Sequence, residues 1–216
     1  MLVSWSTILE AFLETVQMVS ISFIFSVILG LPLGILLYVT RPGQILENKI
    51  IFTILNGVIN VFRSLPFIIL LVAIIPVTKF IGGTSIGTEA AIVPMVFFAG
   101  PYISRLVESS LLEVDEGVLE AADAMGATPM QTIIKFVLPE AFGSLIVNFT
   151  ISIIGLVGAS AMAGTVGGGG IGDLAITYGY QRFDTVTMLI TVVILIIMVQ
   201  GLQSAGNKFA RVVRRR

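Results

Sequence analysis

The sequence predicts an all-α membrane protein built on five transmembrane helices. Of its 216 residues, 56% are apolar and only 12% are charged, whereas soluble domains carry about 25% charged residues. The mean hydropathy is +1.04, and five stretches each approach the roughly 20 apolar residues that a spanning helix requires. Little sequence is left between them for a soluble domain, so we expect residues 1–216 to form a single transmembrane domain.

The five predicted spans follow one another along the chain. They lie at about residues 16–38, 63–77, 87–112, 141–163 and 184–205. The first is closed by the turn Thr40-Arg41-Pro42-Gly43. The start of the second is ambiguous, because the apolar run begins at Ile50, and Ile50 to Val77 would measure about 42 Å as a helix. This exceeds the roughly 30 Å hydrocarbon core, so we expect its first part to lie at the membrane interface.

The distribution of Lys and Arg predicts the orientation, since short cytoplasmic loops retain positive charge. One side of the membrane would carry ten such residues: Arg41, Lys49, Arg63, Arg105, Lys135, Lys208, Arg211, Arg214, Arg215 and Arg216. The other side would carry only Lys79 and Arg182. We therefore expect an external N-terminus and a cytoplasmic C-terminus. The first forty residues contain no Lys or Arg, which argues against a cleavable signal peptide, so we expect the first span to be retained.

The composition also excludes several kinds of chemistry. The chain contains no His and no Cys, which removes haem and iron–sulfur ligation, Cys/His zinc sites, Cys nucleophiles, disulfides and the usual general base. The formal net charge of −1 argues against a nucleic-acid partner. We therefore expect no catalytic residue, metal or cofactor on this chain, and we expect any energy source to be held by another chain.

The amphipathic segment 113–138, between the third and fourth predicted spans, predicts two short cytoplasmic helices. Asp115 can cap the first helix, and Gly126 can end it in a left-handed conformation. Thr128 can then cap a second helix with Pro129 at its first position, where a missing N–H costs nothing.

The first of these helices presents an apolar ridge. The ridge residues fall at helical spacing on one side: Val118, Leu119, Ala122 and Met125. Acidic residues occupy much of the remaining surface: Glu116, Glu120 and Asp123. Two interpretations stay open, a helix that docks into a groove on a partner and a loop helix that rests on the protein's own span ends. The second helix is expected to end at Leu138, with Pro139 opening the fourth span.

A longer spacing pattern in this segment resembles a known family. Glu120-Ala121-Ala122 is followed after three residues by Gly126, and after nine more by Phe136, Val137 and Leu138-Pro139. This pattern resembles the EAA loop of importer-type ABC permeases, in which the position of Phe136 is often Ile. In that family the loop forms coupling helices that sit in a cleft of the ATPase subunit. The resemblance implies the following coupling residues: Glu120, Ala121, Ala122, Gly126, Leu138 and Pro139.

The resemblance extends over essentially the whole chain. The segments that carry it are Arg41-Pro42-Gly43-Gln44, Arg63-Ser64-Leu65-Pro66-Phe67-Ile68-Ile69-Leu70-Leu71, Gly83-Thr84-Ser85-Ile86-Gly87, Met125-Gly126-Ala127-Thr128-Pro129-Met130-Gln131, Val166-Gly167-Gly168-Gly169-Gly170-Ile171-Gly172 and Tyr178-Gly179-Tyr180. They are similar to the permeases of methionine importers. The resemblance implies the type I ABC importer permease fold, in a non-enzymatic subunit of the bacterial cell membrane that works by alternating access. It also implies a homodimer, two ATPase subunits that bind ATP and Mg, and an external lipoprotein that delivers methionine.

The glycine-rich run after the fourth predicted span has its own interpretations. Gly167, Gly169 and Gly172 fit the pattern G-x-G-x-x-G, but a membrane span precedes them and no Walker A lysine follows, which argues against nucleotide binding. Small residues at the end of the span permit close helix approach. Because Met162 is bulky and flexible among these neighbours, we predict that Met162, Gly164 and Gly167 lie at a substrate path or gate. Ordinary helix packing is an equally good explanation of this methionine.

Other functions stay open from the sequence. One is a permease of the same class for another amino acid. Another is a stand-alone channel or secondary carrier in which residues 113–138 only connect two spans. The lack of internal repeats and the scarcity of charged residues within the spans argue against a channel or secondary carrier. Arg63 lies at a predicted span end, where snorkelling to the interface explains its charge better than a transport role.

Overall fold

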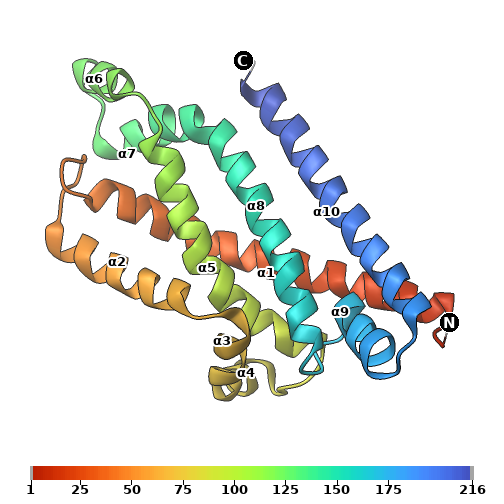
Figure 1. The fold of residues 1–216 in the computed structure, drawn as a ribbon. Coiled ribbons are helices and arrows are strands. Elements are labelled where there is room, and N and C mark those ends of the chain that lie inside the picture. The colour runs from red at the N-terminus through yellow and green to blue at the C-terminus, as the bar shows by residue number, and fades with distance from the viewer. Residues whose placement is uncertain (1, 215–216) are drawn as a thin grey trace.

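The computed structural model describes residues 2–214, and every regular element in this range is a helix (Figure 1). The elements are α1 (Trp5–Thr40), α2 (Lys49–Ser64), α3 (Phe67–Ala73), α4 (Ile75–Gly82), α5 (Thr88–Leu112), α6 (Glu116–Ala124), α7 (Pro129–Thr132), the π-helical η1 (Ile133–Val137), α8 (Leu138–Gly164), α9 (Gly170–Leu174), the π-helical η2 (Ala175–Gln181) and α10 (Thr185–Arg214). The all-α prediction is therefore confirmed.

Four helical stretches within residues 2–214 are long and apolar enough to cross a membrane by themselves. They are Trp5–Thr40, Thr88–Leu112, Pro129–Gly164 and Thr185–Val213. The pair α2 and α3 passes the same test only as one bent unit, so the described chain has four spans, or five if this pair counts as one. The first span begins about ten residues before the predicted residue 16, because the helix extends back to a cap at Ser4.

The second span, expected at residues 63–77, is not a single helix. The chain forms α2 up to Ser64, turns by 102° and continues as α3. Pro66 causes the break, since proline lacks the N–H that a helix interior needs and disfavours helical backbone in the residue before it. Leu65 is accordingly extended, with φ −85° and ψ 126°. A helix does start near Ile50, as the apolar run indicates, but this helix, α2, ends where the predicted span 63–77 begins.

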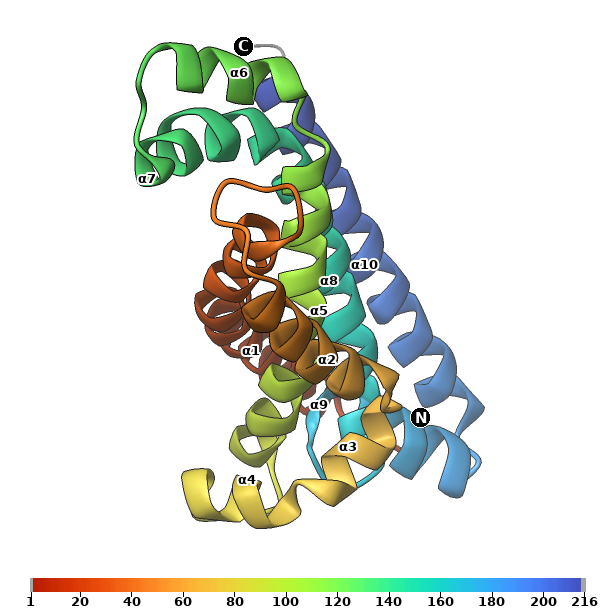
Figure 2. The same cartoon turned by 90° about the vertical axis from the view of Figure 1, so that its left-hand side faces the viewer.

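Two views show how the long helices are arranged (Figures 1 and 2). Helices α5, α8 and α10 run side by side, and α1 crosses them obliquely. Helix α6 and the end of α10 lie at one end of the molecule, which we call the α6 end. Helices α3 and α4 and the start of α1 lie at the opposite end, which we call the α4 end.

Glycines bring α1 and α5 into close contact. A Cβ atom on Gly30 would lie 2.7 Å from the carbonyl oxygen of Gly100, and one on Gly34 would lie 2.5 Å from that of Ser104. Because the two glycines are four residues apart, they lie on the same face of α1. Membrane helices associate largely through such close packing, since lipid supplies no hydrophobic drive between them.

Within residues 2–214 the core consists of three clusters of buried side chains, the smallest of which joins α1 and α9. The first joins α1, α5 and α8 around Met18, Met95 and Leu156. The second lies around Tyr38 and Val107 and includes residues of η1. By contrast, only 11% of the most apolar part of α10 is buried, so this helix presents most of its surface outward.

Candidate functional site

Helix α6 has the ends that the sequence predicts. The Asp115 carboxylate accepts a hydrogen bond from the backbone N–H of Gly117 at 2.8 Å, which caps the start of the helix. At the other end Gly126 has φ 69°. The N–H of Ala127 donates to the carbonyl of Ala122 at 3.0 Å, and that of Gly126 donates to Asp123 at 2.8 Å. These two bonds form a Schellman motif, which requires the left-handed conformation that glycine adopts at least cost.

The second helix of the segment begins as predicted but does not end at Leu138. Thr128 and Gln131 form a capping box, with Pro129 at the first helical position. The helix then continues through η1 into α8, so Pro139 lies inside a continuous helical run and does not open a separate span. The wider π-helical turn precedes Pro139, where an ordinary α-helical turn would set the proline ring against the carbonyl four residues earlier.

The predicted coupling residues differ in their exposure. Glu120, Ala121, Gly126 and Pro139 are exposed, and Leu138 is half-buried. Ala122 is 0% exposed, because α6 rests with this side on η1 of the same chain. The structure therefore does not bring Ala122 to the surface with its neighbours.

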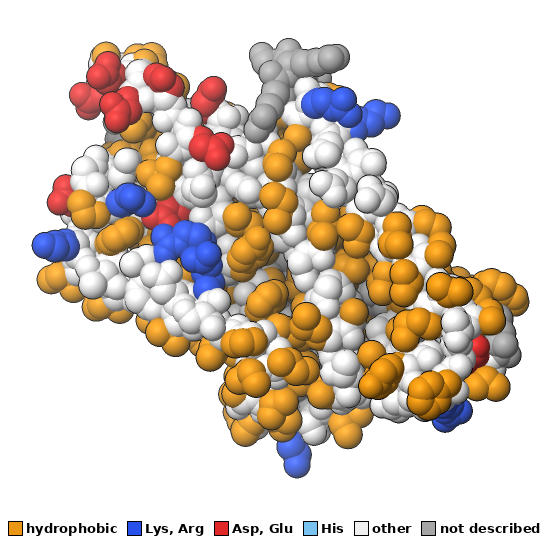
Figure 3. Space-filling model, viewed as in Figure 1, with side chains coloured by type: hydrophobic (Ala, Val, Ile, Leu, Met, Phe, Trp, Pro, Cys, Tyr) orange, Lys and Arg blue, Asp and Glu red, His pale blue; other side chains and the backbone are white. Residues whose placement is uncertain are grey.

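The outward surface of α6 is acidic. Glu116, Glu120 and Asp123 are exposed, and acidic side chains gather over α6 in the space-filling view (Figure 3). No Lys or Arg occurs from residue 106 to residue 134. Of the predicted apolar ridge, Leu119 packs against the buried cluster around Tyr38, and Met125 is exposed. Helix α6 thus rests on its own chain with one face and leaves an acidic face free.

The predicted gate residues lie where α8 ends, at the α4 end of the molecule. A Cβ on Gly164 would lie 2.3 Å from the backbone nitrogen of Asp173, so the close packing of α9 on α8 accounts for this glycine. Gly167 has φ 82° and forms the turn that follows. Met162 is 51% exposed. The structure therefore places Gly164 in a packed contact and leaves Met162 free.

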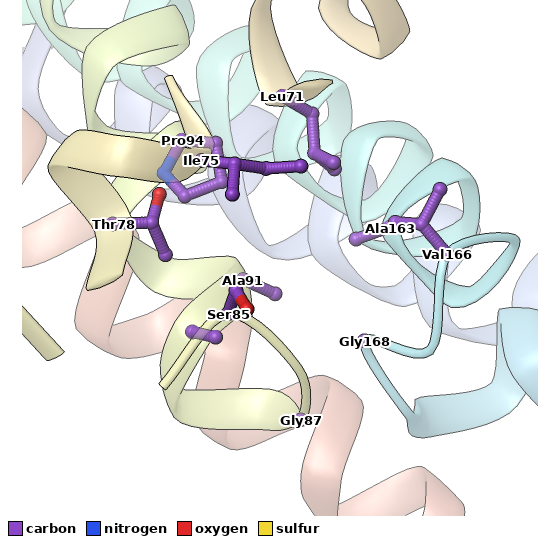
Figure 4. A pocket seen from close by; sticks show the side chains of 11 residues that line it. Leu71, Ile75, Thr78, Ser85, Gly87, Ala91, Pro94, Ala163, Val166 and Gly168 are labelled. Atoms are coloured by element: carbon purple, nitrogen blue, oxygen red, sulfur yellow. The ribbon is translucent and has the colours of Figure 1, made fainter. Parts of the chain in front are cut away.

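A small pocket adjoins this turn (Figure 4). It lies among α3, α4, the start of α5 and the glycine-rich turn, and its empty volume is about 280 Å³, including space open to solvent. Leu71, Ile75 and Thr78 face Ala163 and Val166 across it. The N–H of Gly87 donates to the carbonyl of Gly167 at 2.9 Å. The segment before α5 is therefore tied to the turn after α8.

Two residues that were not predicted from the sequence hold the glycine-rich turn from the other side. The Glu14 carboxylate accepts a hydrogen bond from the N–H of Gly170 at 2.7 Å. The Thr15 hydroxyl accepts one from the N–H of Ile171 at 2.9 Å. These are free N–H groups at the start of α9, which need acceptors when they are buried. The only signal in the sequence is a carboxylate beside a hydroxyl just before the first predicted span.

Residues 30–214 match the family described as "Binding-protein-dependent transport system inner membrane component". The chain belongs to this family. It is therefore the membrane component of a transport system, a non-enzymatic subunit with several membrane-spanning helices.

Individual members of the family are similar to this permease over nearly its whole length. The "Probable D-methionine transport system permease protein MetI" of Vibrio cholerae is 51% identical over 97% of this chain and 93% of its own. The protein of the same name from Haemophilus influenzae is 43% identical over 98% of this chain and 100% of its own. A solved structure of the MetNI methionine ABC transporter in an inward-facing conformation matches 98% of this chain and 99% of its own at 47% identity, with a TM-score of 0.95.

The permease also contains a buried carboxylate that the sequence analysis overlooked. Glu108 of α5 is 1% exposed and lies 3.2 Å from the guanidinium of Arg41 and 2.5 Å from that of Arg105. Charged residues inside a span indicate function by default. An Arg and a Glu three residues apart within the predicted span 87–112 were the signal for this pair.

Both arginines of this cluster also contact α2. Arg105 donates to the side-chain oxygen of Asn60 at 3.0 Å and to that of Asn56, and the guanidinium of Arg41 lies 6.0 Å from the ring centre of Phe52. The three α2 residues are spaced by four, so they lie along one helical face.

Within residues 2–214 no three acidic side chains are grouped so that they could hold a metal ion.

Proposed function

We propose that this permease is the membrane-spanning subunit of an ATP-driven importer for methionine. It would work as a homodimer with two ATP-binding subunits and would receive methionine from an external binding lipoprotein. The observation that carries this proposal is the match to relatives named for D-methionine transport over nearly the full length of both chains. The similarity to the MetNI methionine ABC transporter supports the ATPase partner and the permease dimer.

In this proposal α6 is the element that docks on the ATPase subunit. Its ends are fixed by Asp115 and Gly126, and one side rests on η1, so it can transmit force without unfolding. Glu120 and Ala121 lie on the free face and would contact the partner directly. Ala122 would act indirectly, because only a small side chain lets α6 lie close to the chain beneath it.

The α6 end would face the cytoplasm, with the N-terminus outside. This orientation is supported by the positive charges, since Arg41 and Lys49 flank the loop after α1 and Lys208 and Arg211 lie near the end of α10. The contact of Gly87 with Gly167 would then close the external side, in keeping with the inward-facing crystal structure that this chain resembles. ATP on the partner would bias the switch between this state and an outward-open one.

Met162, Gly164 and Gly167 would line the substrate path near this external closure. The exposed position of Met162 supports a role for its side chain. The two glycines would act through the backbone, Gly164 by allowing α9 to pack and Gly167 by shaping the turn. The two alternatives, another amino-acid cargo and a stand-alone channel or carrier, are decided by experiment.

The test is uptake into vesicles that contain the purified complex of this chain with the ATPase subunit and binding protein of its own source. We expect uptake of radiolabelled methionine only when ATP is present on the side of the membrane that carries the ATPase subunit. Unlabelled methionine should compete with this uptake, and other amino acids should not. If only a different amino acid competed, that amino acid would be the cargo in place of methionine. Uptake without ATP or the ATPase subunit would establish the channel or carrier instead.

A further inference from the structure

Helix α2 is attached to the rest of the molecule at few points. Ile59 is its one buried residue. An apolar pocket lies between it, α1 and α5, with an empty volume of about 680 Å³ that includes open space. At the end of α2 that adjoins α3, the rings of Phe62 and Phe97 are 6.1 Å apart. The other half of α2 is held by the polar contacts of Arg41 and Arg105.

These polar contacts converge on one buried carboxylate. Glu108 binds both arginines, and each arginine reaches α2, Arg41 at Phe52 and Arg105 at Asn56 and Asn60. A buried charge needs partners, and well-packed apolar side chains often hold helices equally well or better. Attachment alone therefore does not explain the network. Its directional hydrogen bonds fix the register of α2 against α5, which apolar packing around a pocket would not do.

The network lies beside the junction between α5 and α6. Glu108 is in the last turns of α5, which ends at Leu112, and α6 begins at Glu116. A displacement of α6 therefore moves the end of α5 that carries Arg105 and Glu108. At its other end α2 meets the 102° bend at Leu65–Pro66, where the backbone bonds of a continuous helix are interrupted and rotation is least opposed.

We propose that Arg105 and Glu108 are positioning residues that carry the movement of α6 to α2, which pivots at Leu65–Pro66. Asn56 and Asn60 are the points at which α2 receives this movement. The inference rests on the proposed function, because it assumes that an ATPase subunit moves α6. It assigns to these side chains a part in coupling in addition to their part in packing.

The test measures the position of α2 in the complex with the ATPase subunit. The chain has no Cys, so cysteines introduced at the exposed positions Ile54 on α2 and Ser109 on α5 would be the only spin-label sites on each permease chain. Dilution with unlabelled chains isolates the distance within one copy of the homodimer. Distances are recorded without nucleotide and with ATP bound. In the same samples, uptake and ATP hydrolysis give the substrate moved per ATP.

The decisive variant is the double substitution Asn56→Ala/Asn60→Ala, which removes both hydrogen bonds from Arg105 to α2 and leaves Glu108 paired. Arg63→Gln is the matched control, since Arg63 is exposed on α2 outside the network. We expect the double variant to retain the ATPase subunit and hydrolysis, to lose the ATP-dependent change in label distance and to move about 2- to 30-fold less substrate per ATP. Glu108→Gln, which weakens the network on the α5 side, should also lose the ATP-dependent distance change and move less substrate per ATP.

An unchanged distance response and unchanged substrate per ATP in the double variant would overturn the inference. Loss of the ATPase subunit from the double variant would also overturn it, since the network would then only maintain the fold. Failure of the unsubstituted chain to bind an ATPase subunit would instead count against the proposed function, so the two failures are distinguishable.

Discussion

The Glu14 carboxylate accepts a hydrogen bond from the backbone N–H of Gly170, 156 residues later in the chain, at 2.7 Å. The contact joins α1 to the start of α9, directly after the glycine-rich turn. It supplies a charged acceptor to a buried N–H at a helix start, where the helix dipole favours negative charge. The glycine-rich turn is thus held from α1 through Gly170 and from the segment before α5 through Gly87.

Replacing Glu14 by Ala should loosen this turn locally. A hydrogen bond to a charged group contributes about 1.5–3 kcal/mol, so hydrogen exchange in the peptide that contains Gly170 and Ile171 should become about 10- to 100-fold faster. Glu10→Ala is the control, because Glu10 is exposed on the same helix. Equal exchange in the two variants would show that the turn does not depend on this contact.

Replacing Gly34 by Ala should destabilise the packing of α1 on α5. The added Cβ would lie 2.5 Å from the carbonyl oxygen of Ser104, and such overpacking costs about 1–3 kcal/mol. Gly57→Ala in α2 is the matched control, since a Cβ there meets nothing within 4 Å and alanine favours a helix by up to about 1 kcal/mol. Thermal unfolding in detergent should therefore shift downward for Gly34→Ala only.

Asp184 gives the stability of the α4 end a defined dependence on pH. The Thr187 hydroxyl, followed by the backbone N–H of Leu2, lowers the pKa of Asp184 from 3.8 to about 2. A lowered pKa means that the stabilisation is present above pH 4 and is lost as the pH falls toward 2. The midpoint of thermal unfolding should be lower for Asp184→Asn than for the unsubstituted chain at pH 7, and the difference should shrink below pH 4. A difference that is constant across this range would contradict the assignment.

Met162→Ala tests the proposed substrate path. If the exposed side chain contacts substrate on its way through, methionine uptake should fall and discrimination against other amino acids should weaken, while the complex stays assembled. The measurement is competition uptake in vesicles. An unchanged rate and unchanged selectivity would leave Met162 with a packing role alone.

The ends of α6 and the start of α7 could be predicted from the sequence because their causes are local. Asp115, Gly126 and Thr128 each act on backbone groups within five residues of themselves. Such capping depends little on the remaining fold. The continuation of the second helix through Pro139 was not predicted, since it depends on a π-helical turn that the surrounding packing stabilises.

The bend of α2 and the buried cluster at Glu108 depend on distant contacts. Pro66 marks a break in the sequence, but the direction of α3 after the break is set by its packing on α5 and α8. The partner of Glu108 at Arg41 is 67 residues away. No spacing rule connects them, so only the assembled helices show that Arg41, Arg105 and Glu108 form one unit.

Purification of the complex from native membranes in mild detergent tests most directly whether α6 couples this permease to an ATPase subunit. Gly126→Val strains the left-handed end of α6, and Gly83→Val is its matched control, because Gly83 ends α4 with φ 70° and open space around it. The unsubstituted chain and Gly83→Val should retain an ATPase subunit, and Gly126→Val should lose it or bind it weakly. A chain that purifies alone, or a Gly126→Val variant that keeps its ATPase subunit and full transport, would contradict the account.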